Sequence, residues 1–235
     1  MSRVALVTGA AGGIGGAIVA KLEADGWSVH GVDVADGDLT TREGNRAVVD
    51  AALERFGRLD AVVANAGIQY VAPVAEFPEE RWDALIALLL TSPFLLAKYA
   101  WPSLAESGDG RFCAVASAHG LAASPFKSAY VAAKHGVLGL VKTLGLEGAS
   151  AGISASAVCP GYVRTPLVER QIADQARAHG LPEERVLEDV ILAPHAVKRL
   201  LEPDEVAGAV AFALGPSGRA LTGAPLVVDL GWTAR

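Results

Sequence analysis

The sequence predicts an α/β protein in which one domain is built on a doubly wound, mainly parallel sheet. Short apolar runs alternate with longer helical patterns along the whole chain, which is the order of a parallel sheet covered by helices on both faces. A glycine-rich loop follows the first apolar run. The length of 235 residues and the hydrophobic content of 51% suit one large domain with a substantial core.

The first unit of the chain, residues 3–33, combines a strand, a glycine-rich loop, a helix and a second strand. Residues 3–8 are apolar and predict a buried parallel strand. The loop Gly9-x-x-x-Gly13-x-Gly15 then opens an amphipathic helix to about residue 25, and residues 28–33 form the next strand. Glycines let the backbone approach a pyrophosphate, and the N–H groups of the helix start attract the anion. The unit therefore predicts a Rossmann-type fold that binds a dinucleotide.

Asp33 ends the second predicted strand and predicts which dinucleotide binds. A carboxylate at this place can accept hydrogen bonds from the adenosine ribose, and it repels a 2′-phosphate. No Arg or Lys lies between Gly31 and Thr41. The sequence thus favours NAD over NADP, although a solvated turn aspartate is the alternative interpretation.

The remaining elements follow from apolar periodicity and from Gly and Pro positions. Residues 35–41 are too few for a helix and a third strand before the helical pattern 43–55, so the third strand is predicted to be shortened or lost, with residues 38–39 as a remnant. Further strands are expected at 59–65, 111–117, 153–159 and 225–229. Helices are expected at 78–103, at 128–149 and at 203–214, the first kinked or split at Pro93 and closed near Pro102. Two polar helical patches at about 165–190, separated at Gly180, predict a mobile lid over a site.

Three side chains point to chemistry on a carbonyl group. Tyr130 and Lys134 are four residues apart in an Ala-rich run, so a helix places them on one face. An ammonium beside a phenol favours the phenolate, and we expect it to lower the phenol pKa. Ser117 ends a predicted strand, at the edge where α/β sheets bind ligands. A Ser that holds a carbonyl oxygen and a Tyr that protonates it are the groups needed to reduce a ketone.

Composition argues against several other classes of function. The net charge is −6 and no basic cluster is present, so no nucleic-acid partner is expected. The apolar, uncharged run 84–97 is shorter than the ~20 residues that span a bilayer. No signal peptide precedes the first strand, so we expect a cytoplasmic protein without a membrane partner. Cys113 and Cys159 are expected to be buried free thiols. The five His residues show no ligand spacing, so no metal is expected.

Five motifs in order resemble the short-chain dehydrogenase/reductase family. They are Thr8-Gly9-x-x-x-Gly13-x-Gly15, Asn65-Ala66-Gly67, Ser117, Tyr130-x-x-x-Lys134 and Pro160-Gly161-x-x-x-Thr165. The runs 117–130, 159–163 and 165–172, together with Trp232, resemble the branch of bacterial D-3-hydroxybutyrate dehydrogenases. The resemblance covers essentially the whole chain. It implies an NAD-dependent, reversible oxidation of (R)-3-hydroxybutyrate by a homotetramer, with Ser117, Tyr130 and Lys134 as catalytic residues.

The same resemblance implies roles for the binding residues. The implied cofactor-binding residues are Gly9, Gly13, Ile14 and Gly15 at the pyrophosphate, Asp33 at the ribose, Asp38 and Leu39 at the adenine, and Asn65, Gly67, Tyr130, Lys134, Pro160, Val163 and Thr165 along the groove. The implied ligands of the substrate carboxylate are Gln69, His119, Lys127 and Gln171. Lys127 would supply a full opposite charge. For each of these four, an ordinary structural or surface role is the alternative.

One position departs from the family pattern. The family usually has an Asn on the helix after the fourth strand, where it helps to hold a water chain that carries protons to solvent. Counting from Trp82, this chain has Leu89 there, unless Thr91 or Ser92 takes the role. Two alternatives therefore stay open: a reductase of the same family for a sugar, steroid or acyl-thioester, and an NAD-binding regulator without turnover.

Overall fold

The computed structural model describes residues 2–234 and contains a parallel sheet with the strand order β2-β1-β3-β4-β5-β6. The chain moves outward from β1 to β2, returns to β3 on the other side of β1, and continues to β6. This order reverses direction between β1 and β3, which is where doubly wound sheets bind ligands. The strands are β1 (Val4–Thr8), β2 (Ser28–Val32), β3 (Ala61–Ala64), β4 (Arg111–Val115), β5 (Ser154–Pro160) and β6 (Pro225–Val228).

The predicted loss of the third strand is confirmed for the described part of the chain. Between β2 and α2 (Arg42–Phe56) the backbone forms turns only, so β2 is an edge of the sheet. Leu39, in the expected remnant, is buried and packs in the same core as Val48 and Val49 of α2. A buried leucine on the turn thus keeps contact with the core although the strand is missing.

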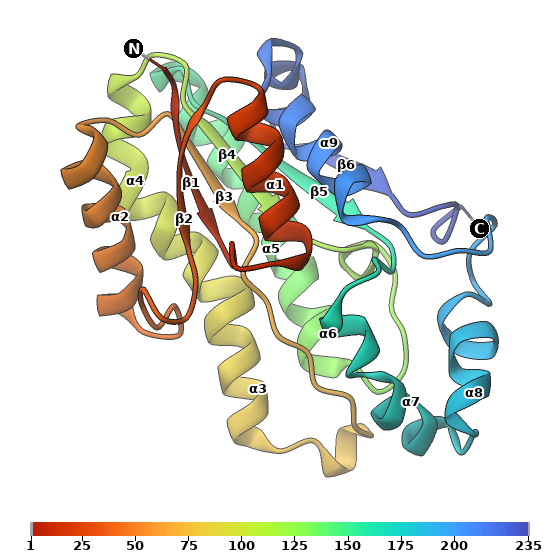
Figure 1. Cartoon of the computed structure of the whole chain (residues 1–235). Coiled ribbons are helices and arrows are strands. Elements are labelled where there is room, and N and C mark those ends of the chain that lie inside the picture. Colours follow the sequence, from red (N-terminus) through yellow and green to blue (C-terminus); the bar gives the residue numbers. More distant parts are fainter. Residues whose placement is uncertain (1, 235) are drawn as a thin grey trace.

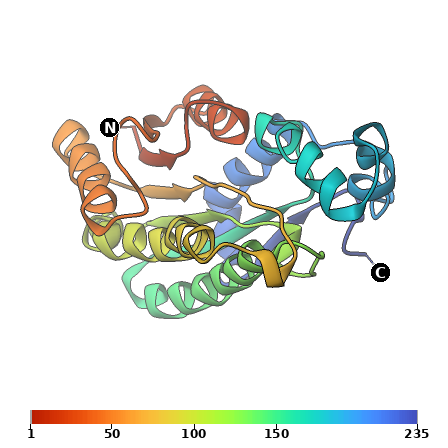
Figure 2. The same ribbon diagram turned by 90° about the horizontal axis from the view of Figure 1, so that it is seen from below.

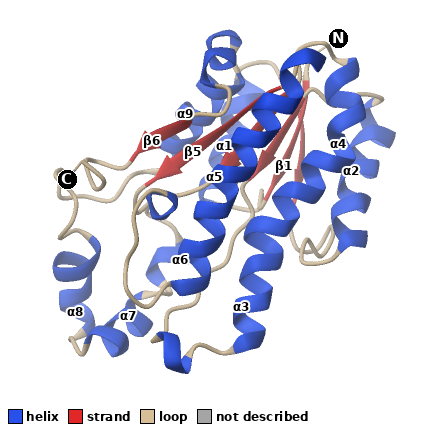
Figure 3. Cartoon of the chain, turned by 180° about the vertical axis from the view of Figure 1, so that it is seen from behind, coloured by secondary structure: helices blue, strands red, loops and turns tan. Residues whose placement is uncertain are grey.

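Helices cover both faces of the sheet, as the alternation of elements predicts. On one face α1 (Gly13–Ala24) packs against α9 (Pro203–Leu214), and on the other α2 packs against α4 (Ser92–Glu106), which contacts α5 (Ser128–Gly148). Figure 2 shows these two layers along the strands, and Figure 3 shows the face with α4 and α5. Alternate strand residues enter opposite cores: Leu6 lies in the core under α4 and α5, whereas Val7 lies in the core under α1 and α9.

The long helical run after β3 differs in detail from its prediction. The helix α3 (Glu79–Ile86) passes through a π-helical turn, Ala87–Thr91, into α4. Pro93 therefore lies directly after the π-helical turn, inside one continuous helical run, where its missing N–H interrupts the backbone hydrogen bonds. The prediction that the helix closes near Pro102 is wrong, because α4 continues to Glu106. Burial of Ala100 and Leu104 in the core stabilises this last turn.

By length and composition alone, the run Glu79–Glu106 could cross a membrane, because an 18-residue window within it has a mean hydropathy of 1.6. In the structure, however, α4 packs between α2 and α5, and its apolar side chains Leu95, Leu96 and Leu104 are buried. Core packing therefore explains why this run is apolar.

Residues 166–191 form the small helical segment expected at 165–190. It contains α6 (Pro166–Glu169), α7 (Ile172–His179), α8 (Glu183–Val186) and a π-helical turn, Leu187–Ile191. Gly180 ends α7 with a φ of 66°, as its position in the sequence predicts. Figure 1 shows α3 and this segment extending beyond the edge at which the strands end. The segment has its own small apolar core, which includes Tyr162, Val168 and Val186.

Candidate active site

A cavity of about 680 Å³ lies along the carboxyl ends of the strands. Every candidate residue predicted from the sequence lines it, although these residues come from positions 9 to 171 of the chain. The cavity-lining candidates are Gly9, Gly13, Ile14, Gly15, Asp33, Asp38, Leu39, Asn65, Gly67, Gln69, Ser117, His119, Lys127, Tyr130, Lys134, Pro160, Val163, Thr165 and Gln171. The common edge of a parallel sheet thus brings the separate motifs into one site.

The glycine loop between β1 and α1 is shaped to accept a pyrophosphate. A Cβ added to Gly15 would collide with the Gly9 carbonyl oxygen, so only glycine lets the loop fold back on itself. The Asn65 amide fixes the loop by donating to the carbonyl oxygens of Thr8 (2.9 Å) and Gly9 (3.2 Å). No side chain caps the start of α1, which leaves its N–H groups for a ligand. These residues fit a dinucleotide.

Thr8 is a structural residue at the start of this loop, and no separate role was predicted for it from the sequence. Its hydroxyl accepts hydrogen bonds from the backbone N–H groups of Asn65 (3.0 Å) and Ala66 (3.1 Å). It thereby ties the end of β1 to the end of β3, the two strands at the reversal point of the sheet. The Thr8-Gly9 dipeptide at the end of an apolar strand is the sequence feature that could have predicted this role.

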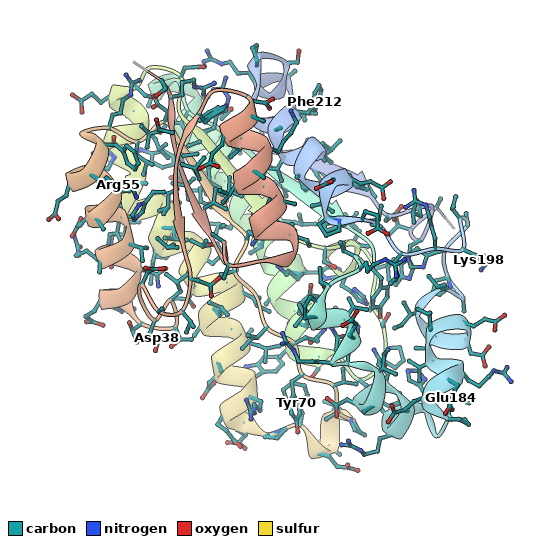
Figure 4. All side chains as sticks on the ribbon, in the orientation of Figure 1. Asp38, Arg55, Tyr70, Glu184, Lys198 and Phe212 are labelled. Atoms are coloured by element: carbon teal, nitrogen blue, oxygen red, sulfur yellow. The ribbon has the colours of Figure 1, made fainter. Side chains whose placement is uncertain are left out.

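The end of the cavity beside β2 carries two carboxylates, those of Asp33 and Asp38. Asp33 accepts hydrogen bonds from the backbone N–H groups of Ala11 (2.9 Å) and Val34 (2.8 Å), which connects the end of β2 to the glycine loop. Asp38 lies on the turn after β2 (Figure 4), and hydrogen bonds from Thr40 lower the pKa of its carboxyl. No basic side chain lines this end within the described residues.

Ser117, Tyr130 and Lys134 lie together at the centre of the cavity. Ser117 follows β4 by two residues, so the predicted strand 111–117 ends earlier than expected. Its side chain lines the same cavity as that of Tyr130, which lies in the first turn of α5. The Lys134 Nζ lies 5.6 Å from the centre of the Tyr130 ring and donates to the Val115 carbonyl oxygen at 2.8 Å. The phenol therefore faces the glycine-lined cavity with a serine and an ammonium beside it.

The predicted acidification of Tyr130 is not found in the chain by itself. Burial raises the pKa of Tyr130 above its usual value of 10, and the hydrogen bond from Ser117 opposes this shift only in part. Burial also lowers the pKa of Lys134 to about 8. The prediction considered the helical spacing of the two residues, whereas desolvation of both groups has the larger effect in the folded chain.

Lys127 is a buried ammonium in the same cavity as Ser117 and Tyr130. It is only 2% exposed, and its Nζ donates to the Tyr162 hydroxyl (2.8 Å) and to Gln171 Oε1 (3.3 Å). Both partners are neutral, and burial lowers the pKa of Lys127 to about 7. The preceding residue, Phe126, has a φ of 66°, an uncommon conformation for a bulky residue, and its ring packs on His179 of α7. A buried cation with only neutral partners is suited to receive an anion.

The other predicted carboxylate ligands already have partners. The ring nitrogens of His119 lie 3.4 Å from the Ser117 hydroxyl and 3.0 Å from the Ser124 hydroxyl. Burial lowers the pKa of His119 to about 3, so the imidazole stays neutral. Gln171 donates to the Leu167 carbonyl oxygen at 2.8 Å, and Gln69 accepts from the Tyr70 N–H at 2.9 Å.

Leu89 occupies the position where the family usually has Asn. It lines the cavity, is 1% exposed, and packs with Leu85 of α3 and with Ala129 and Ala133 of α5. Ser92 instead donates to the Asn45 side chain of α2 at 2.6 Å. Neither Thr91 nor Ser92 lines the cavity, so they do not replace the missing amide.

Comparison with known proteins agrees with this geometry. A family model described as "Enoyl-(Acyl carrier protein) reductase" matches residues 30–233. The D-beta-hydroxybutyrate dehydrogenase of Rhizobium meliloti (strain 1021) is 39% identical over 258 residues, with all of both chains covered. The enzyme of the same name from Cupriavidus necator is 38% identical and covers 99% of this chain and 98% of its own. The ligand-free aldohexose dehydrogenase of Thermoplasma acidophilum has a TM-score of 0.89 at 28% identity, with 100% of this chain and 95% of that chain covered.

The full-length matches extend over the glycine loop, the central Tyr and Lys, and the sheet that brings them together, whereas the family model covers the chain from residue 30 onward. We conclude that the chain belongs to the short-chain dehydrogenase/reductase family and is an oxidoreductase that works with a nicotinamide dinucleotide.

Proposed function

We propose that this protein catalyses the NAD-dependent, reversible oxidation of (R)-3-hydroxybutyrate to acetoacetate. The observation that carries the proposal is Lys127, a buried ammonium with neutral partners that lines the same cavity as Ser117 and Tyr130. A small hydroxy acid brings a carboxylate to Lys127 and a hydroxyl to the phenol. A sugar, a steroid or a thioester would leave the ammonium buried without an anion, which costs binding energy. The names of the two D-beta-hydroxybutyrate dehydrogenases support the same substrate class.

In this proposal, Ser117 and Tyr130 hold the oxygen on C3 of the substrate. The Tyr130 phenolate removes the hydroxyl proton while C3 gives up its hydride, and the phenol returns that proton in the reverse direction. A bound NAD supplies the hydride acceptor and a positively charged ring. Because burial raises the pKa of Tyr130, its phenolate needs positive charge nearby, and Lys134 provides one on the next turn of α5. Lys134 would also bind the nicotinamide ribose, as the resemblance to the family implies.

The choice of NAD over NADP rests on the acidic end of the cavity. Asp33 and Asp38 line it together with Val34, Gly37 and Leu39. A 2′-phosphate would meet two carboxylates and no basic side chain of the described chain there, which disfavours NADP.

The proposed activity can be tested by following NADH absorbance with each enantiomer of 3-hydroxybutyrate and either NAD or NADP. We expect NADH to form from the R enantiomer with NAD, and at least tenfold slower turnover with the S enantiomer or with NADP. Oxidation of an aldose without oxidation of either enantiomer would contradict the substrate. NAD binding without turnover of any alcohol would favour the regulator, for which Leu89 is the motivating observation.

Assembly and location are part of the same proposal. We propose a homotetramer, because Phe94 on α4, Leu146 on α5, Phe212 on α9 and Val227 on β6 expose apolar surface; Figure 4 shows Phe212 on the outside of α9. Light scattering of the purified protein should give about four times the 24.1 kDa chain mass. We also propose a cytoplasmic location and a lid role for residues 166–191, whose α6 lines the cavity through Leu167 and Val168.

A further inference from the structure

Tyr162 lines the cavity beside Lys127 and Gln171, and no role was predicted for it from the sequence. It follows β5 by two residues, lines the cavity and is 8% exposed. Its ring stands at 87° to the His119 ring, with 5.8 Å between the ring centres. It also packs in the small core of the lid segment with Val168 and Val186. Packing on several sides therefore fixes the direction of its hydroxyl.

The Tyr162 hydroxyl accepts a hydrogen bond from the Lys127 ammonium at 2.8 Å, which leaves its own proton to donate. No hydrogen bond among residues 2–234 uses that proton. Burial raises the pKa of Tyr162, so the phenol remains protonated. Lys127 has three N–H donors, of which Tyr162 and Gln171 take two. One Lys127 N–H and the Tyr162 O–H are thus two unused donors on adjacent groups.

Gln171, by contrast, uses its oxygen and one of its two amide N–H groups inside the protein. Its Oε1 accepts from Lys127 at 3.3 Å, and its amide nitrogen donates to the Leu167 carbonyl oxygen at 2.8 Å. A carboxylate has only acceptor oxygens, so it needs donors rather than the Gln171 oxygen. The arrangement makes the Gln171 oxygen a partner of Lys127 and leaves one Gln171 N–H as a further donor.

We propose that the Tyr162 hydroxyl binds the substrate carboxylate directly, beside Lys127. This inference rests on the proposed function for the identity of the acid. A carboxylate held by an ammonium and a phenol, both packed from behind, sits at a fixed distance from Ser117 and Tyr130. Tyr162 is then a specificity residue for small free acids.

The first test compares wild type with Tyr162→Phe, which keeps the packed ring and removes the donor. Loss of one hydrogen bond to a charged group should raise the KM for (R)-3-hydroxybutyrate roughly tenfold to a hundredfold. The kcat and the KM for NAD should change less than about threefold, since these depend on other residues. Tyr99→Phe, on α4 against Arg46, is the matched control and should change none of them. A fall in kcat without a rise in the KM for the acid would overturn the inference.

The second test does not depend on turnover. Isovalerate has the carboxylate and branched carbon skeleton of a short acid but no hydroxyl to oxidise. Calorimetry of the NAD-loaded protein should show isovalerate binding that Tyr162→Phe weakens by a factor similar to the rise in KM. If wild type oxidises no hydroxy acid but shows this Tyr162-dependent binding, the proposed function fails and the carboxylate site stands. Unchanged binding in the variant, or no isovalerate binding by wild type, refutes the site even where turnover is present.

A crystal structure of the complex with NAD and isovalerate separates direct binding from an effect through Lys127. We expect the Tyr162 oxygen about 2.6 to 3.0 Å from a carboxylate oxygen, and the Gln171 amide still on Lys127. A carboxylate held by Lys127 or Gln171 but distant from the Tyr162 hydroxyl would refute the inference.

Discussion

Replacing Lys127 by Met should weaken substrate binding and stabilise the free protein at the same time. Methionine keeps an unbranched side chain of similar length and removes the charge. The wild-type ammonium is 2% exposed and has no acidic partner among the described side chains. Such a charge is costly until a substrate anion arrives, which is why the two effects have opposite signs.

The structure sets the size of both effects. Removing one partner of a buried, hydrogen-bonded charge pair costs about 2 to 5 kcal/mol of binding, so the KM for (R)-3-hydroxybutyrate should rise roughly thirtyfold to several thousandfold. The fall in the Lys127 pKa from 10.5 to about 7 corresponds to a folding penalty on the order of 5 kcal/mol. In the variant, Tyr162 and Gln171 lose their hydrogen bonds from the ammonium, which destabilises the folded state by about 1 to 3 kcal/mol and offsets part of the gain. The net gain of a few kcal/mol should raise the Tm by roughly 5 to 10 °C.

Calorimetric melting without substrate and NADH-based kinetics measure the two effects on the same samples. The stabilisation should be largest below pH 7 and should shrink between pH 7 and 10.5, because there the unfolded wild-type chain binds the proton that the folded chain has lost. The KM for NAD should change less than about threefold. A variant that melts several degrees lower than wild type at pH 6, with an unchanged KM for the acid, would refute this account of Lys127.

Four further predictions concern the chemistry and the cofactor loop. In the free enzyme the Lys127 ammonium titrates near pH 7, so the KM for the hydroxy acid should rise by up to about tenfold per pH unit above 7, and a pH-independent KM would contradict this. Tyr130→Phe should bind NAD in calorimetry with near-wild-type affinity but lose at least about a thousandfold in kcat; retained activity would exclude the phenol as the acid–base group. Leu89→Asn should change kcat less than about tenfold, because Leu89 packs on Ala129 and Ala133; a gain of about a hundredfold would show that the native site is impaired as a dehydrogenase. Gly15→Ala should abolish measurable NAD binding, because its methyl group would collide with the Gly9 carbonyl, whereas Gly16→Ala, which meets only Ala10 at 3.6 Å, should bind NAD normally.

Much of the architecture could be predicted from local patterns. The strands could be located from apolar runs bounded by glycines. The short polar segment between β2 and α2 correctly predicted that the sheet lacks its third strand. The helix α4 was predicted to close near Pro102, because the cost of a proline is visible in sequence but the compensating burial of Leu104 is not. The candidate residues could be assigned to one site in advance, because the carboxyl ends of all parallel strands lie at the same edge of the sheet.

The sequence by itself determined the order of elements, the glycine loop and the helical spacing of Tyr130 and Lys134, since these depend on residues close together in the chain. Only the tertiary structure decided the electrostatics of the site. It placed Lys127 on Tyr162 and Gln171, which lie 35 and 44 residues further along the chain, and it put Lys134 on the Val115 carbonyl, 19 residues away. It also turned Leu89 rather than Ser92 toward the cavity. The cost of a buried charge depends on what surrounds it in space, and those neighbours come from segments that sequence spacing does not relate.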